Sequence, residues 1–306
     1  MNRLIFGILL GSLALNSFSQ KNDFSTLDLA FDYFSNTNTF GQFNQITKQP
    51  SYSPSLSYFH KSGFNASIIS NVVGNSDTAL ENPTYEYDFM AGYYYTFANY
   101  FTIFPSYIHY FYPNKTSTLL SSFTDNFSID FSADYKNLYS GVSINYLLGN
   151  SNEWFITTYL SYTFDFESIV GNSDYLMVQP ELNFNFGNQT YYSNYILDRL
   201  QSDEDYRSEL LSDRTILHDY RILRELYPDA TEFELFSLLF AQYTEQNDEF
   251  NLSSIGLSFP VAYMIGNFTI NASFSTYFLM NKPNYVDEDF QTYFSFGLGY
   301  SFMWKR

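Results

Sequence analysis

The chain has 306 residues, a formal net charge of −18 and an aromatic content of 22%, with 30 tyrosines and 34 phenylalanines. A soluble core of this size cannot cover so many rings, whereas a membrane barrel exposes them to lipid and at both interfaces. The acidic charge disfavours nucleic acid or anionic lipid as the main partner. The absence of cysteine excludes disulfides and a lipid-modified cysteine.

The N-terminal residues 1–19 have the features of a secretory signal peptide. Arg3 supplies the positive start, a short apolar run follows, and small residues favour cleavage before Gln20. No later stretch offers about 18 uninterrupted apolar residues, so helical membrane spans are not expected. The predicted mature chain, residues 20–306, is a single barrel domain.

Alternation of apolar and polar residues recurs along the chain, and a period of two is typical of β-strands. In the last such segment, the aromatic rings fall on one side and Ser295, Gly297, Gly299 and Ser301 on the other. The sequence predicts twelve strands, at 24–35, 52–60, 63–72, 84–97, 99–112, 123–135, 138–147, 154–167, 174–187, 249–263, 267–280 and 290–303.

The predicted connections alternate between short and long, with two exceptions: the link at 149–153 is short where a long one is expected, and that at 168–173 is longer than expected. Tight turns are expected at 61–63, 98–99, 136–137 and 265–267, with longer polar segments between them. An even number of strands places both termini on one side, as in single-chain outer-membrane barrels. We therefore expect an all-β fold: a transmembrane antiparallel barrel of about twelve strands, located in the outer membrane.

The region 189–248 interrupts the barrel pattern with helical periodicity. One helix is predicted near 194–210, and a second follows Ser212 and ends before Pro228. The third begins at Thr231 with the residue spacing of a capping box. The domain organisation thus includes a helical insertion within the barrel.

Two hypotheses concern this insertion. Arg214, His218 and Arg221 share a helix face, so they are candidates for a plug or gate at the barrel mouth; the alternative is local ion pairing on a solvated surface. The third helix is apolar nearly all round and must be buried against something. Its candidates for binding an envelope protein are Leu235, Phe236, Leu239 and Phe240.

Strand faces opposite the aromatic residues are expected to line the lumen, and they carry many carboxylates and almost no lysine or arginine. Such carboxylates attract mobile cations or the arginines of the insertion. The predicted acidic lumen residues are Asp28, Asp32, Glu86, Asp88, Asp130, Asp134, Asp165 and Glu181.

An enzyme is the competing class, since a serine and a histidine at the rim of a barrel could hydrolyse lipid esters. The chain has three histidines, and His109 lies near Ser106. Residues three apart on a strand point to opposite faces, so these two cannot pair directly. We predict no catalytic residues, and no motif indicates a metal site or a cofactor.

The chain resembles the outer-membrane β-barrel proteins of Bacteroidetes-type bacteria. The resemblance rests on the signal end Ser17-Phe18-Ser19-Gln20, on strands rich in Tyr, Phe, Asn and Ser, and on the terminal strand 294–302. It implies assembly into the outer membrane by the barrel-assembly machinery. The tail at 303–306, beyond the terminal aromatic residue, departs from the usual pattern.

These observations predict a narrow pore with an acidic lumen for small solutes or cations, in which the insertion acts as a plug or gate. The alternative is a non-conducting structural or docking subunit of a cell-envelope complex. Outer-membrane lipid, the assembly machinery and an envelope protein bound through 189–248 are the expected partners.

Overall fold

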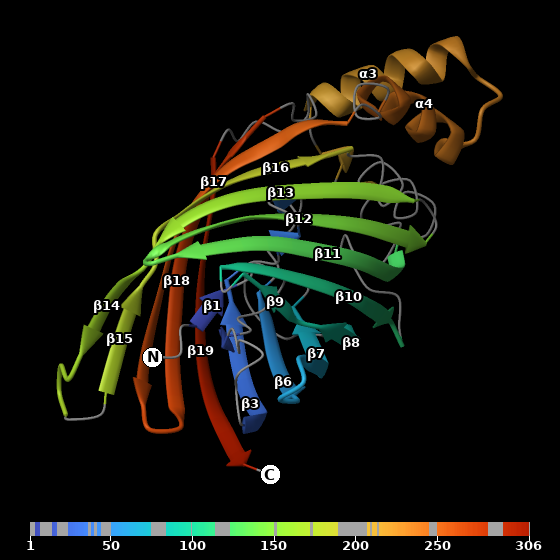
Figure 1. Ribbon diagram of the computed structural model, residues 1–306. Coiled ribbons are helices and arrows are strands. Elements are labelled where there is room, and N and C mark those ends of the chain that lie inside the picture. Colours follow the sequence, from blue (N-terminus) through green and yellow to red (C-terminus); the bar gives the residue numbers. More distant parts are fainter. Residues whose placement is uncertain are drawn as a thin grey trace.

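The computed structural model (Figure 1) describes most of the chain. The described residues are 4–6, 14–16, 24–35, 38–39, 42–43, 50–74, 84–98, 100–113, 123–149, 152–171, 174–188, 207–208, 210–212, 214–244, 250–280 and 290–305.

The barrel wall is built from long antiparallel strands. They are β3 (Phe24–Phe34), β6 (Ser51–Phe59), β7 (Phe64–Val73), β8 (Thr84–Tyr93), β9 (Tyr95–Phe97), β10 (Phe101–Phe111), β11 (Phe123–Tyr135), β12 (Leu138–Gly149), β13 (Glu153–Tyr162), β14 (Phe164–Glu167), β15 (Asp174–Val178), β16 (Glu181–Gly187), β17 (Asn251–Ile265), β18 (Phe268–Leu279) and β19 (Phe290–Lys305). Two small sheets, β1 (Leu4–Phe6) with β2 (Ala14–Asn16) and β4 (Asn38–Thr39) with β5 (Gln42–Phe43), are separate from the wall.

Hydrogen bonding closes the wall into a ring. The order is β17, β16, β13, β12, β11, β10, β8, β7, β6, β3, β19 and β18, and β18 pairs with β17 again. Every pair is antiparallel, and β3 joins β19 over eleven register positions from Phe24 to Phe34. A closed ring leaves no free sheet edge. The predicted fold class, a twelve-stranded antiparallel barrel with a helical insertion, is confirmed.

Three of the twelve strands are interrupted. Tyr94 separates β8 from β9, Thr163 separates β13 from β14, and Gln179 with Pro180 separates β15 from β16. The Pro180 ring cannot donate to the ladder, but its carbonyl accepts from the Tyr162 amide at 3.2 Å. These interruptions bend the wall without opening it.

The two faces of the wall differ in exposure. In β11, Phe127 and Phe131 are 50% and 44% exposed, whereas Asn126 and Ser128, on either side of Phe127, are 0% and 2% exposed. The same alternation of exposed rings and covered polar side chains runs through the neighbouring strands. The rings form an outer apolar belt, as the period of two predicts.

Short turns gather at one end of the barrel. Residues in the left-handed region mark three of them: Gly63 (φ 102°), Lys136 (φ 59°) and Gly266 (φ 57°). The chain enters β3 and leaves β19 at this same end, and the β14–β15 hairpin extends from it (Figure 1). The C-terminal ends of β3, β7, β10 and β18, after which the longer segments of the sequence follow, lie at the opposite end.

Two helices stand outside the wall. Figure 1 shows α3 (Arg214–Leu226) and α4 (Glu232–Thr244) beyond the ends of β16 and β17, clear of the barrel. They pack on each other through Tyr220 and Phe236, whose ring centroids are 5.1 Å apart. The second and third predicted helices are confirmed, while most of the first, 194–210, lies outside the described residues. None of the described helices is long and apolar enough to cross a membrane.

Candidate functional site

All eight predicted lumen carboxylates occupy strand positions opposite the exposed rings. Asp32, Glu86, Asp88 and Glu181 are buried, and Asp28, Asp130, Asp134 and Asp165 are partly buried. The Asp165 carboxylate accepts a hydrogen bond from the Tyr175 hydroxyl in the β14–β15 hairpin. This residue is therefore at the short-turn end and not deep in the lumen.

Near the long-loop end, Glu86 and Asp88 lie two residues apart on β8 and point the same way. Asn71 donates from Nδ2 to Asp88 Oδ2 at 2.9 Å, and Ser53 donates from Oγ to Asn71 Oδ1 at 2.6 Å. This chain of neutral partners joins β6, β7 and β8. It orients the Asp88 carboxylate but supplies no positive charge.

A second group lies deeper, and we call it the tyrosine–carboxylate cluster: Tyr94, Asp130, Tyr139, Tyr159 and Glu181. Asp130 interacts electrostatically with all three phenols, and Glu181 interacts with those of Tyr139 and Tyr159. The Tyr139 and Tyr159 hydroxyls are 3.3 Å apart, and their rings stack at 5.4 Å. Carboxylates and aromatic faces therefore meet in one part of the lumen.

Glycines on neighbouring strands make room for these rings. A Cβ atom on Gly141 would lie 2.3 Å from Tyr159 Oη, and one on Gly256 would lie 2.5 Å from Cε1 of Tyr277. Both distances are far below van der Waals contact. These two positions accept only glycine without a shift of the tyrosine.

The lumen wall is asymmetric in side-chain size. Strands β8 to β13 turn large residues inward, among them Tyr94, Phe104, Tyr110, Tyr139, Phe155 and Tyr159. The facing strands β17, β18, β19, β3 and β6 turn mainly small residues inward, among them Ser258, Ser275, Ser295, Gly297, Ser53 and Ser57. We call this second side the serine wall.

No basic side chain balances the lumen carboxylates from within the wall. The barrel strands contain no arginine and a single lysine, Lys305, at the last position of β19. Within the described residues, no group of three or more His, Asp or Glu side chains is placed to hold a metal ion.

The gate candidates are on the surface of the helix pair. Arg214, His218 and Arg221 are exposed on α3, outside the barrel outline in Figure 1. Among the described residues of the insertion, Arg207 Nε lies 3.9 Å from Glu232 Oε2 and forms an ion pair with it. Whether the three exposed side chains act on the barrel mouth stays a prediction.

A capping box begins α4, as the sequence predicts. The Glu234 carboxylate accepts from the Thr231 amide at 2.7 Å and from its hydroxyl at 2.9 Å, and the Glu234 amide donates to Thr231 Oγ1 at 3.3 Å. These bonds lower the pKa of the Glu234 carboxyl below its ordinary value.

The partner candidates on α4 are largely covered by the chain itself. Leu235, Phe236 and Leu239 are buried, and the side chain of Phe240 lies outside the described part. The exposed apolar side chains of the pair are instead Ile222 and Leu226 on α3, with Leu238 on α4. A partner could reach these residues without unfolding the helices.

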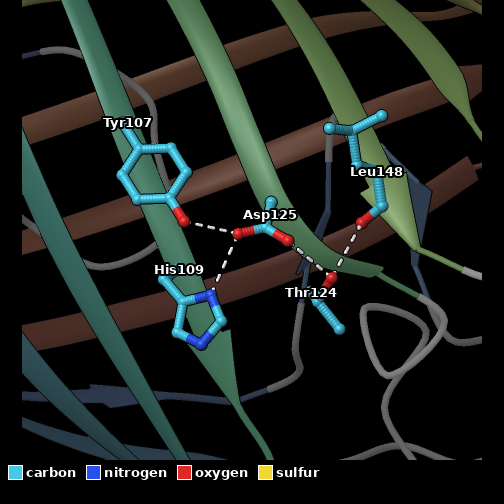
Figure 2. Close-up of polar contacts among 5 residues, drawn as sticks. All are labelled: Tyr107, His109, Thr124, Asp125 and Leu148. Atoms are coloured by element: carbon cyan, nitrogen blue, oxygen red, sulfur yellow. Dashed lines mark hydrogen bonds and ion pairs between the residues drawn. The ribbon is translucent and has the colours of Figure 1, made fainter.

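Figure 2 shows a polar cluster on the outer face near the long-loop end. The Asp125 carboxylate accepts from Tyr107 Oη at 2.5 Å and Thr124 Oγ1 at 2.6 Å, and its Oδ1 lies 3.0 Å from His109 Nδ1. A register shift between Phe123 and Asp125 accompanies it. Sequence reasoning missed Asp125, because this pairing depends on the register of β10 against β11.

Ser106 and His109 lie on opposite faces of β10. Ser106 points inward, where its hydroxyl lies 2.5 Å from that of Ser128, whereas His109 points outward. The two are on opposite faces, as predicted. Figure 2 draws two hydroxyl groups close to Asp125, those of Tyr107 and Thr124, and each donates a hydrogen bond to the carboxylate.

The closed wall, the exposed aromatic belt and the polar interior define a β-barrel that spans a bilayer, because only closed hydrogen bonding satisfies strand backbones in lipid. The protein is an outer-membrane β-barrel.

No protein-family model matches the chain, and no curated protein matches it. Among solved structures, it is similar to a KdgM porin at 12% identity and a TM-score of 0.46, covering 90% of this chain and 99% of that one. It is also similar to an outer membrane channel from Pseudomonas putida F1, at 7% identity and a TM-score of 0.45, covering 94% of this chain and 98% of that one. A NanC porin is similar at 14% identity and a TM-score of 0.41, covering 90% of this chain and 98% of that one. At these identities and TM-scores the likeness is one of fold alone.

Proposed function

We propose that the protein is a narrow outer-membrane channel that passes small cations through its acidic lumen. The observation that carries this proposal is the burial of Asp88 and Glu181 on the lumen side of strands whose only lysine or arginine is the terminal Lys305. A buried carboxylate without a positive partner is destabilised by several kcal/mol. A cation in the lumen offsets that cost and would be concentrated there.

The width of the lumen supports small solutes. The inward side chains at the level of the tyrosine–carboxylate cluster are largely covered, and those from β8 to β13 are mainly large. A twelve-stranded barrel filled in this way leaves only narrow paths. Selection should therefore combine charge with size.

The test is the reversal potential of the purified barrel in planar bilayers under a KCl gradient. We expect a cation-selective potential that moves toward zero in the Glu86→Gln, Asp88→Asn double variant. Glu225→Gln is the matched control, because Glu225 is an exposed carboxylate on α3, away from the lumen. A folded barrel without conductance, or a double variant with unchanged selectivity, would contradict the proposal.

The insertion is proposed as a gate at the long-loop mouth, since it projects beyond β16 and β17 and exposes Arg214 and Arg221. Replacing both arginines by alanine should change the open probability if they contact acidic residues at the mouth. Conductance indistinguishable from that of the unmodified barrel would remove this role.

The second candidate is a non-conducting docking subunit, and the exposed apolar residues Ile222, Leu226 and Leu238 favour it. This alternative requires both an absence of conductance and an envelope protein that co-purifies and is lost when 189–248 is deleted. Conductance in the purified barrel decides for the channel.

A further inference from the structure

We propose that the tyrosine–carboxylate cluster is a binding site for amines, that is, for small organic cations that carry primary ammonium groups. The inference rests on the proposed cation channel and names the class of cation that the channel selects. Its basis is the combination of unpaired acceptors, aromatic faces and net negative charge in one part of the lumen.

The first step concerns hydrogen-bond acceptors. Glu181 is 3% exposed and Gln179 is 1% exposed, and neither Glu181 Oε1 nor Gln179 Oε1 has a hydrogen-bond partner among the described residues. Gln179 is held in place, since its Nε2 donates to Ser161 Oγ at 2.8 Å. A buried acceptor without a donor raises the free energy of the folded protein, so a ligand rich in N–H or O–H groups would bind favourably here.

Register places these acceptors beside the tyrosines. Ser161 pairs with Glu181 between β13 and β16 and with Tyr139 between β12 and β13. Tyr159 lies two residues before Ser161 on the same face of β13. The two oxygens, which are themselves covered, therefore lie in the same part of the barrel as the stacked rings of Tyr139 and Tyr159.

The tyrosines distinguish an amine from an inorganic cation. A primary ammonium group has three donors and no acceptor, which fits the unpaired oxygens. Its alkyl chain packs against ring faces, and its charge is attracted to the π system. A hydrated magnesium ion matches the charge of the carboxylates but has no apolar part to set against the rings.

Charge alone would not select this class. Asp130 and Glu181 each interact electrostatically with Tyr139 and Tyr159, so a ligand between them meets carboxylate and ring together. Gly141 keeps the Tyr159 ring in this position, because any larger residue would collide with its hydroxyl. The stacked rings of Tyr139 and Tyr159 therefore lie beside the carboxylates of Asp130 and Glu181.

The experiment titrates the folded full-length barrel in detergent with 1,4-diaminobutane and, separately, with MgCl2, and measures binding by calorimetry. We expect the diamine to bind more tightly than Mg²⁺ at equal ionic strength. Tyr159→Leu removes the ring and should weaken diamine binding by about 30-fold, which is about 2 kcal/mol at 1.4 kcal/mol per tenfold change.

Matched variants distinguish the loss of the Tyr159 ring from a loss of folding. Tyr162→Leu changes an exposed ring on the outer face, outside the proposed site, and should leave diamine binding unchanged. Glu181→Gln is nearly isosteric and should weaken the diamine even if Tyr159→Leu fails to fold. Equal binding of diamine and Mg²⁺, or diamine binding that Tyr159→Leu and Glu181→Gln leave unchanged, overturns the proposal.

Conductance in KCl distinguishes the two proposals. A barrel that is cation-selective but does not bind the diamine refutes the amine site and leaves the channel intact. A barrel that binds the diamine through Tyr159 and Glu181 but does not conduct refutes the channel and leaves the binding site intact.

Discussion

Replacing Gly141 by alanine tests the close packing of Tyr159 against β12 in the lumen. The new Cβ would lie 2.3 Å from Tyr159 Oη and 2.6 Å from the backbone carbonyl oxygen of Phe131, where ordinary contact begins at 3.4 Å. The phenol must move by about 1 Å, the difference between 3.4 and 2.3 Å, and the carbonyl in the ladder cannot move so easily. Overpacking of this kind lowers the free energy of unfolding by about 1–3 kcal/mol.

The assay is urea unfolding of the barrel refolded into lipid vesicles, followed by the fluorescence of Trp154 and Trp304. Gly299→Ala is the matched control, because Gly299 is also an inward glycine of the wall and its added Cβ would meet nothing closer than 3.7 Å. We expect a lower midpoint for Gly141→Ala and a midpoint within about 0.5 kcal/mol of the unmodified protein for Gly299→Ala. If the two variants unfold alike, the close approach of Tyr159 to β12 is refuted.

Two further predictions concern other parts of the chain. The folded-state pKa of Glu234 is lowered from 4.5, so its contribution to the α4 cap is present above pH 4.5 and is lost as the pH falls through the folded-state pKa. Hydrogen exchange of the amides in the first turn of α4 should therefore become faster at acid pH. An equal acid step in Glu234→Gln would contradict this prediction. Gly266→Ala should cost about 1 kcal/mol of unfolding free energy because φ is 57°, and Gly266→Asn should cost less, since asparagine tolerates the left-handed region; equal urea midpoints for the two variants would show that backbone strain is not the cause.

The barrel could be predicted from the sequence because the alternation of apolar and polar residues along each strand shows which face contacts lipid. A large apolar side chain at every second residue, as at Phe127, Ile129 and Phe131, is stable only against an apolar medium, and twelve such segments define the wall. The α4 capping box was equally readable, since Thr231 and Glu234 interact within one turn and need no distant partner.

Features that depend on pairing between strands could not be predicted. The Asp125 and His109 contact and the fit of Tyr159 over Gly141 both require the cross-strand register, which is set by loop lengths and bulges and not by either strand alone. The sequence identified Asp130 and Glu181 as lumen acids but gave no sign that tyrosines from β12 and β13 surround them.

The serine wall has a consequence for how an ion would travel. The half-buried hydroxyl of Ser295 would offer a ligand in place of water on one flank of a passing cation, while the opposite wall presents mainly rings. Such an ion sheds only part of its hydration shell, so its energy barrier is set by partial dehydration on the aromatic side. Ions of equal charge would then be ranked by how readily they lose a few waters, and weakly hydrated ions would cross first.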